Sequence, residues 1–183
     1  MTRSVVTKRG DKGTTDLFGI CGIPKDNPRF HAQGDIDELN AVLGLLLSDP
    51  LPSIVRPTIE HIQHMLFRVG ADLATPTSVT HVNIKRVRRE DIEYLEQTIT
   101  TLESTLQPQR SFILPNGSRV ASLLHQARAV CRRAERWTVS VSRKETVNQE
   151  ILIYLNRLSD YLFIAARTVN MHMNLPEESV DYS

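Results

Sequence analysis

The stretch from residue 117 to residue 143 constrains the fold of this chain more than any other segment. Its apolar residues recur at intervals of three and four, which places them on one face of an α-helix. Arg128, Arg132 and Glu135 form a second stripe beside that face. An arginine at such a border can grip phosphate or carboxylate, although an edge of solvated ion pairs has the same pattern. The apolar positions are Val120, Leu123, Leu124, Ala127, Val130, Cys131, Ala134, Thr138 and Val141.

The same helical spacing recurs in four further segments. The first predicted helix begins near Gly34, where Asp35 and Glu38 resemble a capping box, and it ends before Ser48. No segment has a convincing strand pattern, so we predict an all-α five-helix bundle with ferritin-like, four-helix-bundle-type packing. The chain forms a single domain, 1–183, with a bundle over 31–175 and a mobile tail over 176–183. The other three helices are predicted at about 53–73, 86–106 and 148–174.

Composition excludes several functional classes. The net charge of +1 over 183 residues gives no global attraction to nucleic acid or to an anionic membrane. No apolar run is long enough to cross a bilayer, and the N-terminus lacks the apolar core of a secretion signal. Only two cysteines are present, and Cys131 lies in an apolar stripe, which argues for a reducing compartment. We therefore expect a cytoplasmic protein that binds neither nucleic acid nor membrane.

Residues 1–30 differ from the rest of the chain. Segment 7–15, Thr-Lys-Arg-Gly-Asp-Lys-Gly-Thr-Thr, combines glycines, hydroxyl groups and cations. Glycines let backbone N–H groups turn toward an anion, while lysine and threonine contact phosphate oxygens directly. The order of a Walker A loop is absent. A phosphate-binding loop and a flexible tail with hairpin turns therefore explain this segment equally well.

Five motifs, taken together and in this order, closely resemble the trimeric, helical-bundle ATP:cob(I)alamin adenosyltransferases, or corrinoid adenosyltransferases. The resemblance runs from about residue 5 to residue 170. It rests on segment 7–15 together with Gly34-x-x-Asp37-Glu38-Leu39-Asn40, Phe112-Ile113-Leu114-Pro115-x-Gly117, Arg128-x-x-x-Arg132-Arg133-Ala134-Glu135-Arg136 and Asn156-Arg157-Leu158-Ser159-Asp160-Tyr161-Leu162-Phe163.

The resemblance implies a homotrimer of five-helix bundles with an active site between neighbouring subunits. It implies transfer of the 5′-deoxyadenosyl group of ATP to the cobalt of cob(I)alamin, which yields adenosylcobalamin and triphosphate. Mg²⁺ would arrive with ATP, so no dedicated protein metal site is expected. By similarity, ATP would be bound by Thr7, Lys8, Arg9, Gly10, Asp11, Gly13, Thr14, Thr15, Lys25, Arg132, Arg133, Ala134, Glu135, Arg136 and Asn156.

Three further residues receive catalytic roles from the resemblance. Asp37 and Arg128 would form an ion pair between subunits, and Phe112 would lie below the corrin ring. There Phe112 would displace the lower axial ligand of cobalt and ease reduction of Co(II), although anchoring in the core explains this residue about as well. Because Co(I) is the nucleophile, the chemistry needs cations for the triphosphate and no general base. A flavoprotein or other reductase would supply Co(I), and an adenosylcobalamin-dependent enzyme would use the product.

Local departures from the family pattern put the detail of the loop in doubt. Val6 stands where the family often has an aromatic residue, and Asp16 and Leu17 stand where it has small hydroxyl residues. Two other classes of protein remain as alternatives. A ferritin-like metal-binding bundle needs paired Glu-x-x-His motifs, which this chain lacks, and no third His, Cys or carboxylate completes a convincing metal-binding set with His61 and His64. A nucleic-acid binder would need a basic stripe free of apolar residues.

Overall fold

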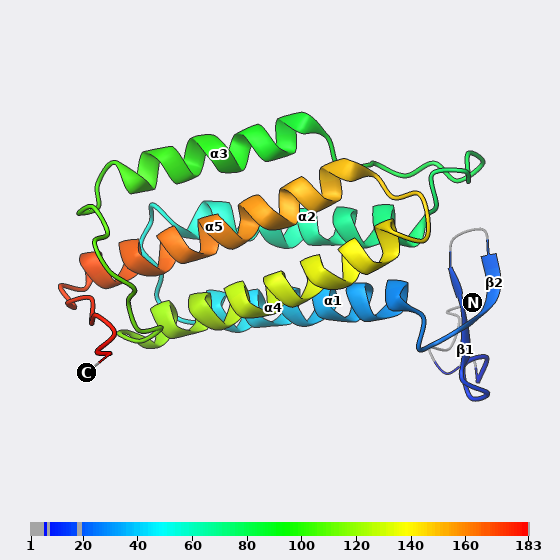
Figure 1. The fold of residues 1–183 in the computed structure, drawn as a ribbon, viewed down its shortest axis with the longest axis horizontal. Coiled ribbons are helices and arrows are strands. Elements are labelled where there is room, and N and C mark those ends of the chain that lie inside the picture. Colours follow the sequence, from blue (N-terminus) through cyan, green and yellow to red (C-terminus); the bar gives the residue numbers. More distant parts are fainter. Residues whose placement is uncertain (1–5, 7, 18–19, 183) are drawn as a thin grey trace.

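The computed structural model describes residue 6, residues 8–17 and residues 20–182 (Figure 1). Each helix that the periodicity predicts is present, so the all-α fold class is confirmed. A small two-stranded sheet precedes the helices. The elements, in order, are β1 (Thr14–Leu17), β2 (Ile20–Pro24), α1 (Pro28–Leu47), α2 (Arg56–Ala74), α3 (Arg89–Glu103), α4 (Arg119–Ser142) and α5 (Gln149–His172).

Helix α1 begins about six residues before its predicted start. Asn27 caps it, with Oδ1 accepting a hydrogen bond from the backbone N–H of Arg29 at 2.9 Å. Pro28 occupies the first turn, where its missing N–H costs nothing. Asp35 and Glu38 therefore lie inside the helix, and their prediction as a capping box is wrong.

Strands β1 and β2 form an antiparallel hairpin. The sequence suggested hairpin turns as one explanation of segment 7–15, but it predicted no strands. Thr14 pairs with Pro24 and Thr15 with Ile23, and the register shifts before Leu17. Asp16 Oδ1 accepts a hydrogen bond at 2.9 Å from the backbone N–H of Gly22 across the hairpin. The strands, of four and five residues, are too short for a period-two pattern to be visible in the sequence.

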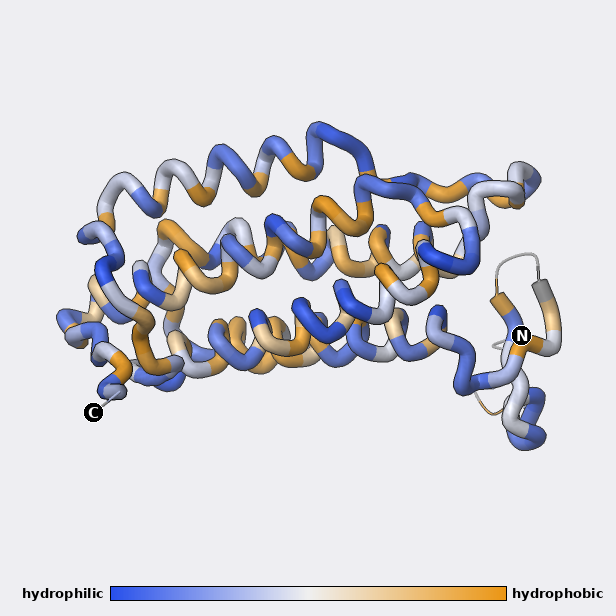
Figure 2. The backbone as a smooth tube through the Cα atoms, in the orientation of Figure 1, coloured by the Kyte–Doolittle hydropathy of each residue, from blue (hydrophilic) through white to orange (hydrophobic). Residues whose placement is uncertain are grey.

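The helices pack so that α4 lies between α1 and α5, while α3 packs on α5 and α2 packs on α1. Figure 1 shows α1 and α2 forming one layer behind α4 and α5. Along the helices, hydrophobic and hydrophilic positions alternate around each turn, as Figure 2 shows. The apolar stripe of α4 is buried almost throughout, including Leu124, Cys131 and Ala134 at 0% exposure. Burial of each large aliphatic side chain contributes about 1.5–3 kcal/mol, so this stripe anchors the bundle.

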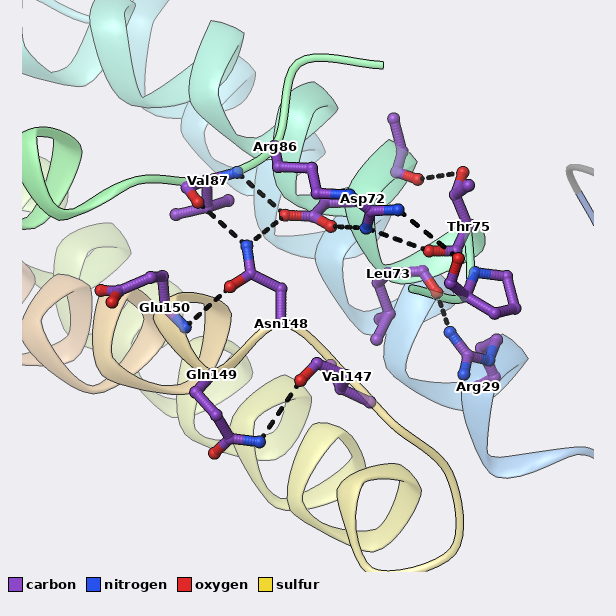
Figure 3. A network of polar contacts seen from close by, with 12 residues as sticks. Arg29, Asp72, Leu73, Thr75, Arg86, Val87, Val147, Asn148, Gln149 and Glu150 are labelled. Atoms are coloured by element: carbon purple, nitrogen blue, oxygen red, sulfur yellow. Dashed lines mark hydrogen bonds and ion pairs between the residues drawn. The ribbon is translucent and has the colours of Figure 1, made fainter. Parts of the chain in front are cut away.

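A buried polar network closes the end of the bundle from which the hairpin projects (Figure 3). The Asp72 carboxylate, fully buried near the end of α2, accepts hydrogen bonds from Arg86 Nη1 at 2.6 Å and from the Val87 N–H at 2.9 Å. It also accepts one from Asn148 Nδ2 at 2.7 Å, and Asn148 caps α5. Because this charge is buried and fully bonded, it joins α2, the segment before α3 and the start of α5.

Arg29 extends these contacts to α1. Its guanidinium, 2% exposed, donates to the backbone oxygen of Leu73 and to Glu145 Oε2, the latter at 2.6 Å. Figure 3 shows Arg29 at the start of α1 reaching the end of α2. The position of α1 just after the hairpin is therefore set by contacts with α2 and with the connection between α4 and α5.

The C-terminal segment is paired with the connection between α3 and α4. The Leu114 N–H donates to the Glu178 oxygen at 2.8 Å, and the Val180 N–H donates to the Phe112 oxygen at 2.9 Å. Arg167 of α5 holds Glu177 through Nε at 2.5 Å. The mobile tail predicted over 176–183 is therefore, over its described residues, a segment with backbone and ion-pair partners.

Candidate functional site

The N-terminal loop and Lys25 lie together, as the sequence predicted, although Thr7 lies outside the described residues. Lys8 and Gly13 have φ angles of 58° and 78°, and the Gly13 oxygen accepts a hydrogen bond from the Lys25 N–H at 2.9 Å. A Cβ on Gly10 would come within 2.8 Å of Lys25 Nζ, so this glycine leaves room for the ammonium group. Among the described residues, no carboxylate forms an ion pair with Lys8, Arg9 or Lys25, so their charges are available to an anionic ligand. The same segment contains Asp11, Thr14 and Thr15.

Arg132 and Arg136 lie four residues apart on the exposed edge of α4. Within the described part of the chain, neither side chain has a hydrogen-bond or ion-pair partner. Two guanidinium groups without partners on one helix edge form a cationic surface suited to an oligophosphate. The side chain of Ala134 is fully buried between them, so it is not available to a ligand.

Arg133 differs from its two neighbours because it already has two carboxylate partners. Its Nε donates to Asp35 Oδ1 of α1 at 2.9 Å, and its Nη2 pairs with Glu38. The hydrogen bond to Asp35 is the main reason that the pKa of Arg133 is raised. This arrangement favours a role in joining α1 to α4 over the direct contact with ATP that the sequence predicted.

Glu135 and Asn156 join the same edge of α4 to α5. Asn156 Nδ2 donates to Glu135 Oε1 at 3.2 Å. The two residues come from separate motifs of the sequence, and the fold places them in contact beside Arg132 and Arg136. The arginine edge therefore continues into polar groups of α5, which could bind the sugar or base of a nucleotide.

Phe112 is 73% exposed on the connection between α3 and α4. This exposure contradicts the alternative in which its ring anchors the loop in the core. The backbone of Phe112 is held by the C-terminal segment, because its oxygen accepts a hydrogen bond from the Val180 N–H. The loop is thus fixed while the ring is presented outward, as a wall for an apolar ligand requires.

One residue that the sequence did not single out, Asn170, fixes the far side of this loop. Asn170 of α5, 5% exposed, accepts from the Ser118 N–H at 3.0 Å and donates to the Asn116 oxygen at 3.0 Å. Gly117 has φ of 108°, and a Cβ there would overlap the Asn170 amide. An asparagine within the apolar repeat of α5 was the one available signal of this contact.

Asp37 and Arg128 are not brought together within one chain. Asp37 lies in a hollow on the α1–α2 side with Phe67, whereas the Arg128 guanidinium lies over the Phe163 ring, 5.4 Å from its centroid, on the α4–α5 side. Among the described residues, neither has an ion-pair partner. The predicted pairing between subunits is compatible with this geometry, and a pairing within one subunit is not.

The two parts of the candidate site lie at opposite ends of the bundle. The hairpin precedes α1, and the connection that carries Phe112 lies at the other end, beside the C-terminus (Figure 1). Arg119, at the start of α4, pairs with Asp49, just after the end of α1, so α4 runs antiparallel to α1. The 20 residues of α1 span about 30 Å at 1.5 Å per residue. One small active site could not include the loop and the Phe112 ring of the same chain.

Buried groups elsewhere offer no conventional nucleophile. Burial raises the pKa of the Cys131 thiol, which donates to the Leu155 oxygen at 3.3 Å and so stays protonated. Burial, assisted by Arg128, lowers the pKa of His125, whose Nε2 has no hydrogen-bond partner. Over the described residues, no group of three or more His, Cys, Asp or Glu side chains could hold a metal ion, and no helix is long and apolar enough to cross a membrane.

A helical bundle with a cationic glycine loop, an arginine edge and an outward aromatic ring is suited to a nucleotide-dependent transferase with a large second substrate. A family model for cobalamin adenosyltransferase matches residues 5–169. The chain belongs to the cobalamin adenosyltransferase family.

Relatives and solved structures agree with this assignment. The chain is 41% identical to a cobalamin adenosyltransferase of Cupriavidus metallidurans, over 91% of this chain and 88% of the relative. It is 41% identical to a corrinoid adenosyltransferase of Bacillus subtilis, over 97% and 92% of the two chains. An F112A variant of a PduO-type ATP:corrinoid adenosyltransferase from Lactobacillus reuteri, complexed with cobalamin and ATP, superposes with a TM-score of 0.91 at 38% identity. That match covers 97% of this chain and 99% of the other.

These findings confirm the family, the bundle fold and the adenosyltransferase activity that the five motifs predicted. They give no support to the ferritin-like alternative. The individual roles of the site residues stay predictions.

Proposed function

We propose that this protein transfers the 5′-deoxyadenosyl group of ATP to the cobalt of cob(I)alamin in active sites that form between two copies of the chain. The observation that carries the proposal is the separation of the N-terminal loop from Phe112 along α1. One subunit would supply Lys8, Lys25 and the loop around them. Its neighbour would supply the arginine edge of α4 and the Phe112 ring.

The cations at this site would stabilise the leaving group. Cobalt attacks C5′ of ATP, the C5′–O bond breaks and triphosphate leaves with the bonding electrons. Lys8, Lys25, Arg132 and Arg136, all without carboxylate partners in the described chain, would neutralise this charge together with Mg²⁺ carried by ATP. Glu135 and Asn156 would orient the nucleoside, and Arg133 would position Arg132 and Arg136 through its bonds to α1.

Phe112 would act on the corrinoid rather than on ATP. Its exposed ring can occupy the space below cobalt, exclude the lower ligand and make Co(II) easier to reduce to Co(I). A reductase, a flavoprotein for example, must supply the electron, and an adenosylcobalamin-dependent enzyme would use the product. We place the reaction in the cytoplasm, where ATP is abundant and both cysteines stay as free thiols.

A homotrimer would satisfy the unpaired charges of Asp37 and Arg128. These groups lie on different sides of the bundle, so their pairing joins unlike surfaces, and three such contacts close into a ring when neighbouring copies are related by a threefold rotation. In a double-mutant cycle, we expect each single substitution to alanine to lower activity and the double variant to lose less than the sum. Additive losses would contradict the pairing.

Complementation between subunits tests the shared site directly. We expect Lys25→Ala and Arg132→Ala, purified separately, each to convert cob(I)alamin and ATP to adenosylcobalamin very slowly. Co-expressed, they should regain activity, because a mixed oligomer contains some sites with an intact loop and an intact α4. Active variants in isolation, or no recovery in the mixture, would contradict a site shared between subunits.

A further inference from the structure

The connection that presents Phe112 has no regular structure of its own to hold it. Residues 107–118, all of them described, form no helix, and Ile113 pairs with Ser179 in an isolated antiparallel bridge. Because the Phe112 ring is 73% exposed, it buries too little surface to fix its own position. The position of the ring therefore depends on contacts that other elements make with the backbone of this connection.

Two buried polar side chains of α5 hold the two ends of the connection. Arg167 and Asn170 are 4% and 5% exposed and lie three residues apart, on one face of the helix. At the start of the connection, Arg167 Nη2 donates to the Gln107 oxygen at 2.8 Å. At its end, Asn170 donates to the Asn116 oxygen and accepts from the Ser118 N–H, both at 3.0 Å. Both ends are therefore anchored on the same turn of α5.

Arg167 also holds the C-terminal segment that lies along the connection. Its Nε donates to Glu177 Oε1 at 2.5 Å, and its Nη2 donates to Glu177 Oε2 at 3.1 Å. Three residues further on, the Val180 N–H donates to the Phe112 oxygen at 2.9 Å. Figure 1 shows the C-terminus beside the start of α4, where the connection ends. One guanidinium group is thus bonded both to the connection and to the segment that bonds the backbone of Phe112.

The contacts of Arg167 are better suited to placing these segments than to stabilising the bundle. Gln107 and Glu177, which its guanidinium group bonds, both lie outside the helices. A buried ion pair adds little net stability, because the cost of removing two charges from water offsets most of their attraction. An apolar side chain could fill the same space but could not bond two irregular segments at once. A guanidinium group can, because its donors form a rigid fork.

We propose that Arg167 is a positioning residue for adenosyl transfer, which holds the 107–118 connection and the C-terminal segment so that the Phe112 ring keeps its place below cobalt. The inference rests on the proposed role of Phe112, and it adds the residue on which that role depends. Arg167 itself needs no contact with ATP or with the reacting atoms. A connection that could move away would let the lower ligand of cobalt return, and small displacements at a reacting centre greatly reduce the rate.

Hydrogen–deuterium exchange of the protein without ligands tests whether Arg167 holds these segments. In Arg167→Met, peptides that contain Leu114 and Val180 should exchange about 10- to 150-fold faster, as expected for loss of a charge-assisted hydrogen bond. Glu177→Ala should have the same effect, and it changes a side chain outside the core, so the test does not depend on how well Arg167→Met folds. Arg68→Met, which removes an arginine–carboxylate pair between α2 and α3, is the matched control and should leave both peptides unchanged.

Electron paramagnetic resonance of cob(II)alamin bound with ATP tests whether this support matters to cobalt. In Arg167→Met and Glu177→Ala, the four-coordinate Co(II) signal should fall by about 10-fold or more. ATP binding, measured by calorimetry, should stay unchanged in both variants, and transfer to pre-reduced Co(I) should persist. Arg68→Met should give the wild-type signal.

Other outcomes would overturn the proposal. Unchanged exchange in Arg167→Met and Glu177→Ala would show that this ion pair does not hold the connection. Faster exchange with an undiminished four-coordinate signal would show that cobalt is insensitive to it, and loss of ATP binding together with the signal would show a general loss of structure. A wild-type protein without a four-coordinate signal would instead overturn the proposed role of Phe112. The exchange rates would then still show whether Arg167 holds the connection.

Discussion

Arg133 of α4 binds Asp35 of α1, with Nε donating to Oδ1 at 2.9 Å, while the exposed Arg132 beside it has no hydrogen-bond or ion-pair partner among the described residues. Two adjacent arginines in one motif thus differ in their partners: Arg133 has carboxylate partners on α1, and Arg132 has none among the described residues. The pair between Arg133 and Asp35 joins α4 to α1 and leaves Arg132 available to a ligand.

We predict that Arg133→Ala lowers the free energy of unfolding by about 1–2 kcal/mol. Asp35, only 14% exposed, would lose its partner, although screening at the 41% exposed Arg133 limits the cost. Urea unfolding measures the change. Arg136→Ala is the matched control on the same helix, and we expect it to stay within about 0.5 kcal/mol of the wild type. Equal stability of the two variants would contradict the structural role of Arg133.

Arg132→Ala should reduce kcat/KM for ATP by about 10- to 150-fold with little change in stability. Loss of one charge-assisted hydrogen bond costs about 1.5–3 kcal/mol, and in the described part of the chain the side chain has no hydrogen-bond or ion-pair partner. Steady-state kinetics at saturating cob(I)alamin measures the effect. Arg143→Ala, an exposed arginine at the end of the same helix, should keep wild-type kinetics. Unchanged kcat/KM in Arg132→Ala would exclude contact with the triphosphate.

Phe112→Ala should leave the free energy of unfolding within about 0.5 kcal/mol of the wild type, because its ring is 73% exposed. A core truncation would instead cost about 3–5 kcal/mol. Reaction from cob(II)alamin with a reductase should collapse, while transfer to pre-reduced Co(I) persists. Electron paramagnetic resonance distinguishes the two coordination states of Co(II). An undiminished four-coordinate signal in the ATP-bound variant would rule out the role below the ring.

Gly117→Ala should destabilise the connection that presents Phe112. The added Cβ would overlap the Asn170 amide. The alanine would also have to adopt the φ angle of 108° that Gly117 has, which strains a residue with a side chain. We expect a loss of about 1–3 kcal/mol, measured by urea unfolding. Gly70→Ala, at a helical glycine with open space above it, is the control and should not destabilise a single folded chain. A neutral Gly117→Ala would show that the loop can adopt another conformation.

Acid should reduce stability through His125. Burial lowers the pKa of this histidine in the folded state, so below pH 6.5 the unfolded state takes up a proton that the folded state resists. Its contribution is therefore present above pH 6.5 and is lost as pH falls toward the folded-state pKa, by at most about 1.4 kcal/mol per pH unit. His125→Gln should flatten this dependence in urea unfolding between pH 7 and pH 5. An unchanged slope in His125→Gln would contradict this role.

The sequence by itself determined the helices, because the spacing of buried residues along a helix is a local property that neighbouring positions reveal. The stripe from Val120 to Val141 is buried as its periodicity predicts. The composition of segment 7–15 did not distinguish a phosphate-binding loop from a flexible tail, and its phosphate-binding role stays a prediction. Helix starts were less predictable, since the cap at Asn27 competes with the capping pattern of Asp35 and Glu38.

Only the tertiary structure decided which partner each polar side chain of the motifs has. Arg132 and Arg133 differ by one position, and the carboxylates that separate their roles come from α1, far away in the sequence. Asn170 reaches Gly117 and Ser118 across the end of the bundle in the same way. Periodicity reports which face of a helix is buried and contains no information about which partner lies opposite. That partner is set by how helices pack, because side chains distant in sequence come together only when the bundle closes.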